Sequence, residues 1–144
     1  MIKVKELVRL KGDPVWTVDP KQTARVAIHI MNDQKIGALP VLDNRKLVGI
    51  VSERDIVRIV SRETEAYLDM PVSSFMTKNV ITASGETTLE DCMEIMTENH
   101  FRHLPILEGD ELVGIVSIRD LVAKLLMNKD ALIIDLEKYI SGKR

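Results

Sequence analysis

Two short stretches of the chain combine the side chains that hold a sugar and a phosphate. Residues 52–55 read Ser-Glu-Arg-Asp, and residues 117–120 read Ser-Ile-Arg-Asp. A carboxylate accepts two hydrogen bonds side by side, which suits the cis-diol of a ribose. A serine hydroxyl at the start of a helix, with an arginine two positions later, suits a phosphate. The pattern therefore predicts two sites for a ribose phosphate.

A plainer interpretation of the same residues is structural. An aspartate in the first turn of a helix stabilises that helix by about 0.3–1 kcal/mol. The serine ahead of it then acts as a simple N-cap. From the residues alone, both interpretations stay open.

The two motifs lie in a longer internal repeat. Residues 47–55 (LVGIVSERD) and 112–120 (LVGIVSIRD) differ only at Glu53 and Ile118, and residues 15–60 align with residues 80–125 without a gap. Such periodicity indicates two fused copies of one structural unit.

Each copy has the pattern strand–helix–strand–strand–helix. The first strands are expected at 15–18 and 80–83, and Thr87 or Thr88 is expected to cap the helix that follows in copy two. Polar links at 43–46 and 108–111 indicate hairpins, and the last helices are expected to begin near Glu53 and Ile118. One such unit buries too little surface to be stable alone, so we expect an α+β fold in which the two units pack with pseudo-two-fold symmetry.

Along the chain, we expect a first domain at 1–64, a second at 65–127 and a C-terminal helical tail at 128–144. A polar linker is expected at 61–71. The apolar positions after residue 121 exceed what one unit needs, so we expect some of them to contact a partner subunit.

Composition narrows the function classes. The net charge of −2 with scattered lysines and arginines gives no reason to expect a nucleic-acid partner, and no apolar run is long enough to span a membrane. The N-terminus lacks the features of a signal peptide, which favours a cytoplasmic location. The single cysteine, Cys92, excludes an intramolecular disulfide, and its position on the apolar face of a predicted helix indicates a core residue. The sequence contains no P-loop or zinc-protease motif and no evident acid–base group, so we expect neither enzymatic activity nor a metal site.

The Gly-x-x-Ser-x-x-Asp pattern, written GIVSERD and GIVSIRD, resembles the nucleotide-contact motif of cystathionine-β-synthase (CBS) domains. Its occurrence in tandem resembles the Bateman module. The resemblance implies a regulatory, homodimeric protein that binds AMP, ADP or ATP without a catalytic cofactor and responds through its own dimer or a regulated protein partner. NAD(H) and S-adenosylmethionine are alternative ligands, and a structural dimerisation module with empty sites is an alternative function.

The resemblance also implies two clefts, each combining the early strands of one copy with the aspartate of the other. Aspartate would bind ribose, serine and nearby basic groups would bind phosphate, and aliphatic side chains would hold adenine. The predicted residues of cleft one are Val15, Thr17, Ile36, Gly37, Ala38, Ile115, Ser117, Arg119 and Asp120. The predicted residues of cleft two are Val80, Thr82, Phe101, Arg102, His103, Ile50, Ser52, Arg54 and Asp55.

The two copies differ at positions that bear on these clefts. Residues 36–38 are Ile-Gly-Ala, whereas the aligned residues 101–103 are Phe-Arg-His. Arg102 and His103 either bind phosphates, or they lie in solvent or pair with acidic side chains. Glu53 opposite Ile118 places a carboxylate beside only one cleft, where it would oppose a bound phosphate, so whether one or both clefts are occupied stays open.

Overall fold

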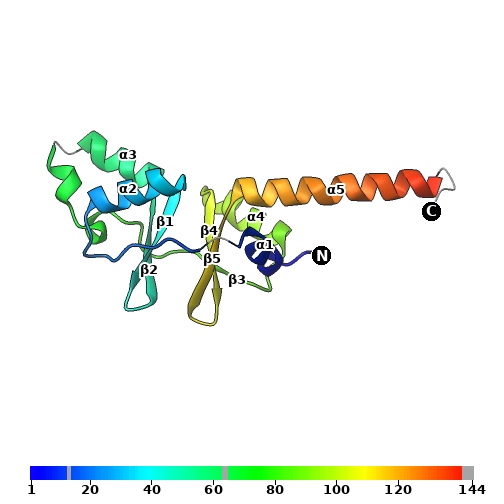
Figure 1. Ribbon diagram of the computed structural model, residues 1–144, viewed down its shortest axis with the longest axis horizontal. Coiled ribbons are helices and arrows are strands. Elements are labelled where there is room, and N and C mark those ends of the chain that lie inside the picture. The colour runs from blue at the N-terminus through cyan, green and yellow to red at the C-terminus, as the bar shows by residue number, and fades with distance from the viewer. Residues whose placement is uncertain (13, 63–64, 141–144) are drawn as a thin grey trace.

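The two repeats form two units that lie side by side, each with its own core. The computed structural model describes residues 1–12, 14–62 and 65–140. In Figure 1 the hairpin of each unit stands near the centre, with α2 and α3 beside one hairpin and α1, α4 and α5 beside the other. Strand β2 of the first unit contacts strand β5 of the second. The predicted α+β fold of two similar units is confirmed.

The first unit is built from local signals that the sequence carries. Thr23 caps α2 (Ala24–Gln34) by accepting a hydrogen bond from the amide of Val26. Strands β1 (Ala38–Asp43) and β2 (Lys46–Ser52) pair antiparallel, and α3 (Glu53–Arg62) follows without a break. Asn44 and Arg45 both have positive φ, which is the geometry of a two-residue hairpin turn whose twist matches that of the strands.

The second unit repeats this order in the same register. Thr88 caps α4 (Leu89–Asn99), so the second of the two predicted threonines is the cap. Strands β4 (His103–Glu108) and β5 (Glu111–Ser117) pair antiparallel, and His103 lies opposite Ser117 as Ala38 lies opposite Ser52. Helix α5 (Ile118–Ile140) continues well past the domain core (Figure 1).

The predicted first strands are wrong in extent. Residues 15–18 contribute only an isolated bridge, in which Val18 pairs with Val41. Residues 80–83 contribute only the start of β3 (Ala83–Ser84), which pairs parallel with β4. The residues ahead of these points leave the sheet, as the exposure of Trp16 and Ile81 (41% each) shows. An apolar run without a neighbouring backbone to pair with cannot extend a ladder.

Each core contains a segment from beyond the predicted boundary at residues 64 and 65. Helix α1 (Val4–Lys11), at the start of the chain, packs into the core of the second unit with Val4 and Leu7 buried. Two 3-10 helices, η1 (Glu65–Asp69) and η2 (Val72–Ser74), lie in and just after the predicted linker, and Val72 is buried in the first core. The boundary stays a prediction, but the two units exchange segments across it.

The apolar stripe predicted beyond residue 121 is only partly described. Leu121 is buried, while Val122 and Leu126 are 40% and 56% exposed. The side chains at 129–136 and the residues 141–144 lie outside the described part of the structure. Among the helices that are described, none has the length and apolar character needed to cross a membrane.

Candidate functional site

Both Ser-x-Arg-Asp motifs lie where a buried strand turns into a helix, and both form a reciprocal cap. The amide of Ser52 donates to Asp55 Oδ2 (2.8 Å) and the amide of Asp55 donates to Ser52 Oγ (3.3 Å). In the second copy the same two bonds measure 2.9 and 3.1 Å, between Ser117 and Asp120. These bonds satisfy amides at a helix start that otherwise lack partners. The structural interpretation is therefore correct for both serines. Any ligand must bind the hydrogen-bonding groups of the motif that the cap does not use.

Asp55 is enclosed by further donors. Its carboxylate is only 2% exposed and also accepts from Ser52 Oγ (3.0 Å) and from Thr77 Oγ1 (3.0 Å to Oδ1). The Arg58 guanidinium lies 3.4 Å from Oδ1. Thr77 is held beside the strand by two backbone hydrogen bonds with Ile50. A ribose at Asp55 would compete chiefly with the long contact from Arg58, which is the loosest of these bonds.

The Asp55 motif lines a cleft of about 590 Å³ between the two units. Eight of the nine residues predicted for cleft two line it, and only Thr82 does not. Gly37 and Ala38, predicted for cleft one, also line this cleft. The predicted residues that the structure brings together here are Ile50, Ser52, Arg54, Asp55, Val80, Phe101, Arg102 and His103.

Several lining residues were not among the predicted site residues. They are Glu53, Arg58, Thr77, Asn79, Ile81, Asn99, His100 and Pro105. Arg58 could have been predicted from the sequence, since it lies one helical turn after Asp55 and so faces the same side of α3. Thr77 and Asn79 lie in the irregular segment after the linker. The sequence contains no periodic pattern that predicts where this segment runs, so their place in the cleft could not be predicted.

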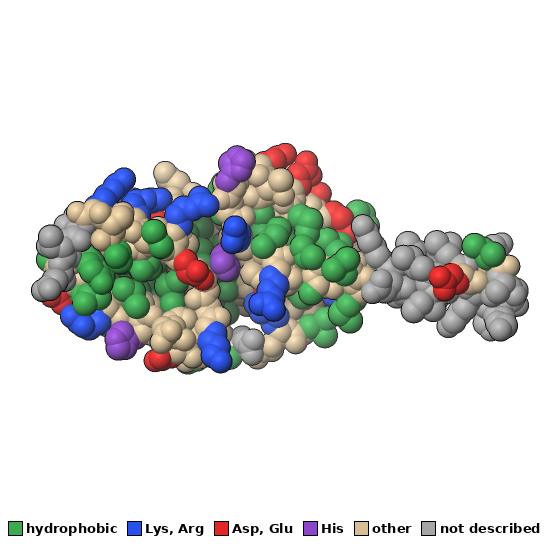
Figure 2. All heavy atoms as spheres, turned by 90° about the horizontal axis from the view of Figure 1, so that it is seen from above, with side chains coloured by type: hydrophobic (Ala, Val, Ile, Leu, Met, Phe, Trp, Pro, Cys, Tyr) green, Lys and Arg blue, Asp and Glu red, His purple; other side chains and the backbone are tan. Residues whose placement is uncertain are grey.

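The cleft is rich in positive charge. Three arginines, at positions 54, 58 and 102, line it together with two histidines, against the carboxylates of Glu53 and Asp55. On the face drawn in Figure 2, basic and histidine side chains gather where the two units meet. Guanidinium groups bind phosphate oxygens in pairs, so this lining suits an anionic ligand.

Glu53 and His103 face each other across Gly37. A Cβ atom on Gly37 would lie 2.7 Å from Glu53 Oε1 and 2.9 Å from His103 Cε1, so any larger residue there would force one of these side chains to move. Burial lowers the pKa of His103, although the carboxylates of Glu53 and Asp120 oppose that shift. The lowered pKa favours the neutral form of His103, and the pairing of His103 with an acidic side chain stays a prediction.

On the other side, the Asp120 motif holds a lysine from the N-terminal helix. Lys11 Nζ lies 2.9 Å from Asp120 Oδ2 and donates to the carbonyl of Ile115 (3.2 Å). Burial alone would raise the pKa of Asp120, but the Ser117 amide and the Lys11 ammonium outweigh it and lower that pKa. The carboxylate predicted to bind ribose in cleft one is therefore already paired with the Lys11 ammonium of the same chain.

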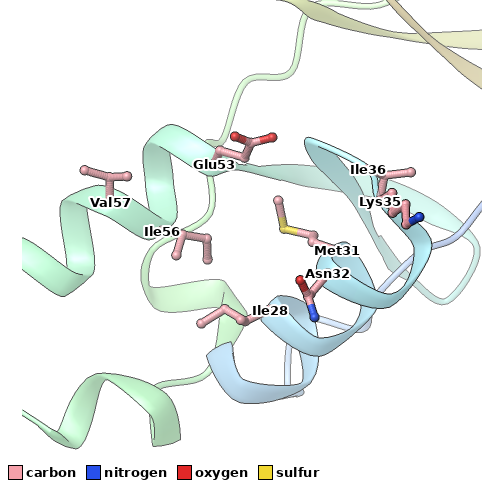
Figure 3. Close-up of a pocket in the computed structure, with 8 residues that line it drawn as sticks. All are labelled: Ile28, Met31, Asn32, Lys35, Ile36, Glu53, Ile56 and Val57. Atoms are coloured by element: carbon pink, nitrogen blue, oxygen red, sulfur yellow. The ribbon is translucent and has the colours of Figure 1, made fainter.

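The other residues predicted for cleft one differ in how exposed they are. Val15 and Thr17 are half-buried, and Arg119 is exposed. Ile36 lines another hollow, of about 530 Å³, between α2 and α3. Figure 3 shows Ile28, Met31 and Ile56 directed into that hollow, with Glu53 at its rim. Of the predicted set, Ile115 and Asp120 bind the Lys11 ammonium, and Ser117 caps the helix beside Asp120.

Comparison with known proteins gives a consistent result. Residues 4–62 and 72–127 match the family model of the CBS domain. The chain is 33% identical to the CBS domain-containing protein YhcV of Bacillus subtilis, over 81% of this chain and 83% of that protein. It is 41% identical to a CBS-domain containing protein of Agrobacterium tumefaciens whose crystal structure superposes with a TM-score of 0.81, covering 85% of this chain and 98% of the other.

Two further similar structures contain adenosyl ligands. CBSX2, solved in complex with AMP, is 27% identical and superposes with a TM-score of 0.76, covering 90% of this chain and 99% of that chain. The CBS domain pair of protein MJ0100, solved with 5′-methylthioadenosine and S-adenosyl-L-methionine, is 25% identical and has a TM-score of 0.77, covering 90% of this chain and 98% of the other.

Proposed function

Because the chain belongs to the CBS-domain family, we propose that it is a regulatory protein that binds an adenine nucleotide in the cleft beside Asp55. The observation that carries this proposal is the lining of that cleft, where the capped motif meets three guanidinium groups. The AMP complex of the similar CBSX2 protein supports the choice of nucleotide. No catalytic step is assigned to the chain.

The charge of the cleft favours a phosphorylated ligand over S-adenosylmethionine. S-adenosylmethionine carries a sulfonium, an ammonium and a single carboxylate, so its net charge is positive and only its carboxylate suits the arginines at 54, 58 and 102. A phosphate accepts charge-assisted hydrogen bonds from the same groups. AMP, ADP and ATP are therefore the first ligands to test, with NAD(H) and S-adenosylmethionine as alternatives.

The proposed ligand would act by favouring one of two conformations. A nucleotide between the units contacts both of them, so it stabilises whichever relative arrangement of the units it fits best. The regulated protein partner would respond to that arrangement. A cytoplasmic location fits the single thiol, Cys92, which is buried.

A homodimer is also proposed, formed by the helical faces of two chains. Val57 on α3 and Val122 on α5 occupy equivalent positions of the two repeats, and both are exposed (66% and 40%). Apolar side chains repeated on one face of both units indicate a surface that another protein covers. Analytical ultracentrifugation tests this proposal. We expect the wild type to sediment at twice the monomer mass, and the double variant Val57→Glu/Val122→Glu to sediment as a monomer.

Calorimetric titration with AMP, ATP, NADH and S-adenosylmethionine tests the nucleotide proposal. Arg54→Gln is the informative variant, because a charge-assisted hydrogen bond contributes about 1.5–3 kcal/mol. Its loss weakens binding about tenfold or more. Arg119→Gln is the matched control, since it is the same residue of the other motif and does not line the cleft.

The expected result is weaker AMP binding in Arg54→Gln and unchanged binding in Arg119→Gln. Absence of binding heat with every ligand at millimolar concentration would instead favour the structural dimerisation module. Equal loss in both variants would contradict the assignment of the ligand to this cleft.

A further inference from the structure

The group that occupies the carboxylate of cleft one is an ammonium from this chain. Lys11 is the last residue of α1, and its side chain spans from the Asp120 carboxylate to the Ile115 carbonyl. Asp120 and Ile115 are both among the residues predicted for cleft one. The side chains of Lys11 and Asp120 are only 33% and 27% exposed, so the pair lies partly within the protein.

Helix α1 is firmly attached at its other end. The amides of Val4 and Lys5 donate to the carbonyls of Thr87 and Gly85 (2.7 and 3.0 Å). Val8 packs so closely on β5 that a Cβ atom at Gly114 would lie 2.8 Å from its Cγ1 atom. The position of Lys11 therefore follows from the docking of the whole helix.

Among the described residues, the other copy of the motif has no charged partner equivalent to Lys11; its positive charge comes from Arg58 of α3, whose guanidinium lies 3.4 Å from Asp55 Oδ1. By the offset that pairs Asp55 with Asp120, Lys11 corresponds to Met76. Met76 is uncharged, and its sulfur lies against Gly49 in the way that Val8 lies against Gly114. Asp55 instead accepts from the neutral hydroxyl of Thr77. The two sites thus differ in the source of their positive charge: Asp120 pairs at 2.9 Å with a lysine of the docked helix α1, and Asp55 pairs at 3.4 Å with an arginine of its own helix α3.

We propose that the Lys11 ammonium blocks nucleotide binding at Asp120, in cleft one, as long as α1 is docked on the second unit. A ribose diol that uses both oxygens of Asp120 must displace the ammonium, which costs the ion pair and the bond to Ile115. Ligand binding at Asp120 is then coupled to release of the end of α1, whereas the cleft at Asp55 fills independently. This inference rests on the proposed nucleotide binding.

Titration of AMP into three proteins tests the inference. Lys11→Met removes the ammonium, keeps a long side chain suited to a helix and installs the residue found at the equivalent position of the other copy. Lys5→Met is the matched control, because it lies on the same helix and also loses an ion pair, to Glu86 (2.7 Å), away from the cleft. Circular dichroism of each variant checks that the fold is retained.

We expect one AMP per chain for the wild type and for Lys5→Met, and two for Lys11→Met. Equal stoichiometry in wild type and Lys11→Met, whether one or two, would overturn the inference and leave the proposed function intact. Loss of a site in Lys11→Met would also overturn it, since the ammonium would then be a phosphate ligand. Binding to none of the three proteins would overturn the proposed function as well.

Discussion

Truncation of the two motif aspartates in the ligand-free protein should have unequal effects. Asp55→Ala leaves the Ser52 amide and the Thr77 hydroxyl without their acceptor in a site that is 2% exposed. At about 1–3 kcal/mol for each buried donor left without a partner, the free energy of unfolding should fall by roughly 2–6 kcal/mol. This loss is a large part of the stability of an ordinary domain.

The same substitution at Asp120 removes a weaker set of contacts. The ion pair with Lys11 is partly exposed and contributes about 0.2–1 kcal/mol, as surface pairs do. Loss of the helix cap adds about 0.5–2 kcal/mol. Asp120→Ala should therefore cost about 1–3 kcal/mol, clearly less than Asp55→Ala.

Urea denaturation followed by circular dichroism measures both values under one condition. Thr77→Val is the control, because its effect should be small when Asp55 is already alanine and about 1 kcal/mol when Asp55 is present. Equal destabilisation by the two alanine variants, or a larger loss at Asp120, would refute the assignment of the buried network to Asp55.

Three further outcomes follow from the structure. Gly49→Ala should lower the free energy of unfolding by about 1–3 kcal/mol, because the new Cβ would lie 2.5 Å from the sulfur of Met76; thermal denaturation measures this. Cys92 should resist iodoacetamide at pH 8 in the native protein and react fully in urea, as followed by mass spectrometry, since burial raises the pKa of its thiol to about 11. Burial lowers the pKa of His103 in the folded state, so the unfolded chain binds its proton first and stability should fall as pH drops below 6.5. His103→Gln should reduce that fall, and an unchanged pH profile would contradict the pKa direction.

The parts of the fold that local chemistry determines could be predicted from the sequence. The hairpins, the caps at Thr23 and Thr88 and the helix starts after Ser52 and Ser117 all depend on residues within a few positions of each other. The aligned copies gave each of these signals twice. The prediction of a strand at 15–18 was wrong because the length of a strand depends on the neighbouring backbone, which a sequence pattern does not reveal.

The site was predictable where it coincides with the motif and not where distant segments enter it. Eight residues predicted for the cleft beside Asp55 do line it. Thr77 and Lys11 reach the two aspartates by tertiary packing from outside the aligned region. A weak signal did exist, since extending the repeat upstream places Lys11 and Gly12 opposite Met76 and Thr77. Those pairs differ in chemistry, so they did not stand out as part of the repeat.

The docking of α1 on the second unit also has a consequence for the order of events during synthesis. Helix α1 leaves the ribosome before both units, yet the strand against which Val8 packs, β5, is the last of the strands to be made. An isolated helix of eight residues is not stable in water, so α1 must wait unfolded until β5 has emerged. The nascent first unit also lacks Val72 and Phe75 of its own core until the chain passes the repeat boundary. The first core can therefore close once residue 76 has emerged, whereas the second must wait for β5 and the start of α5, so cotranslational folding should proceed in two steps.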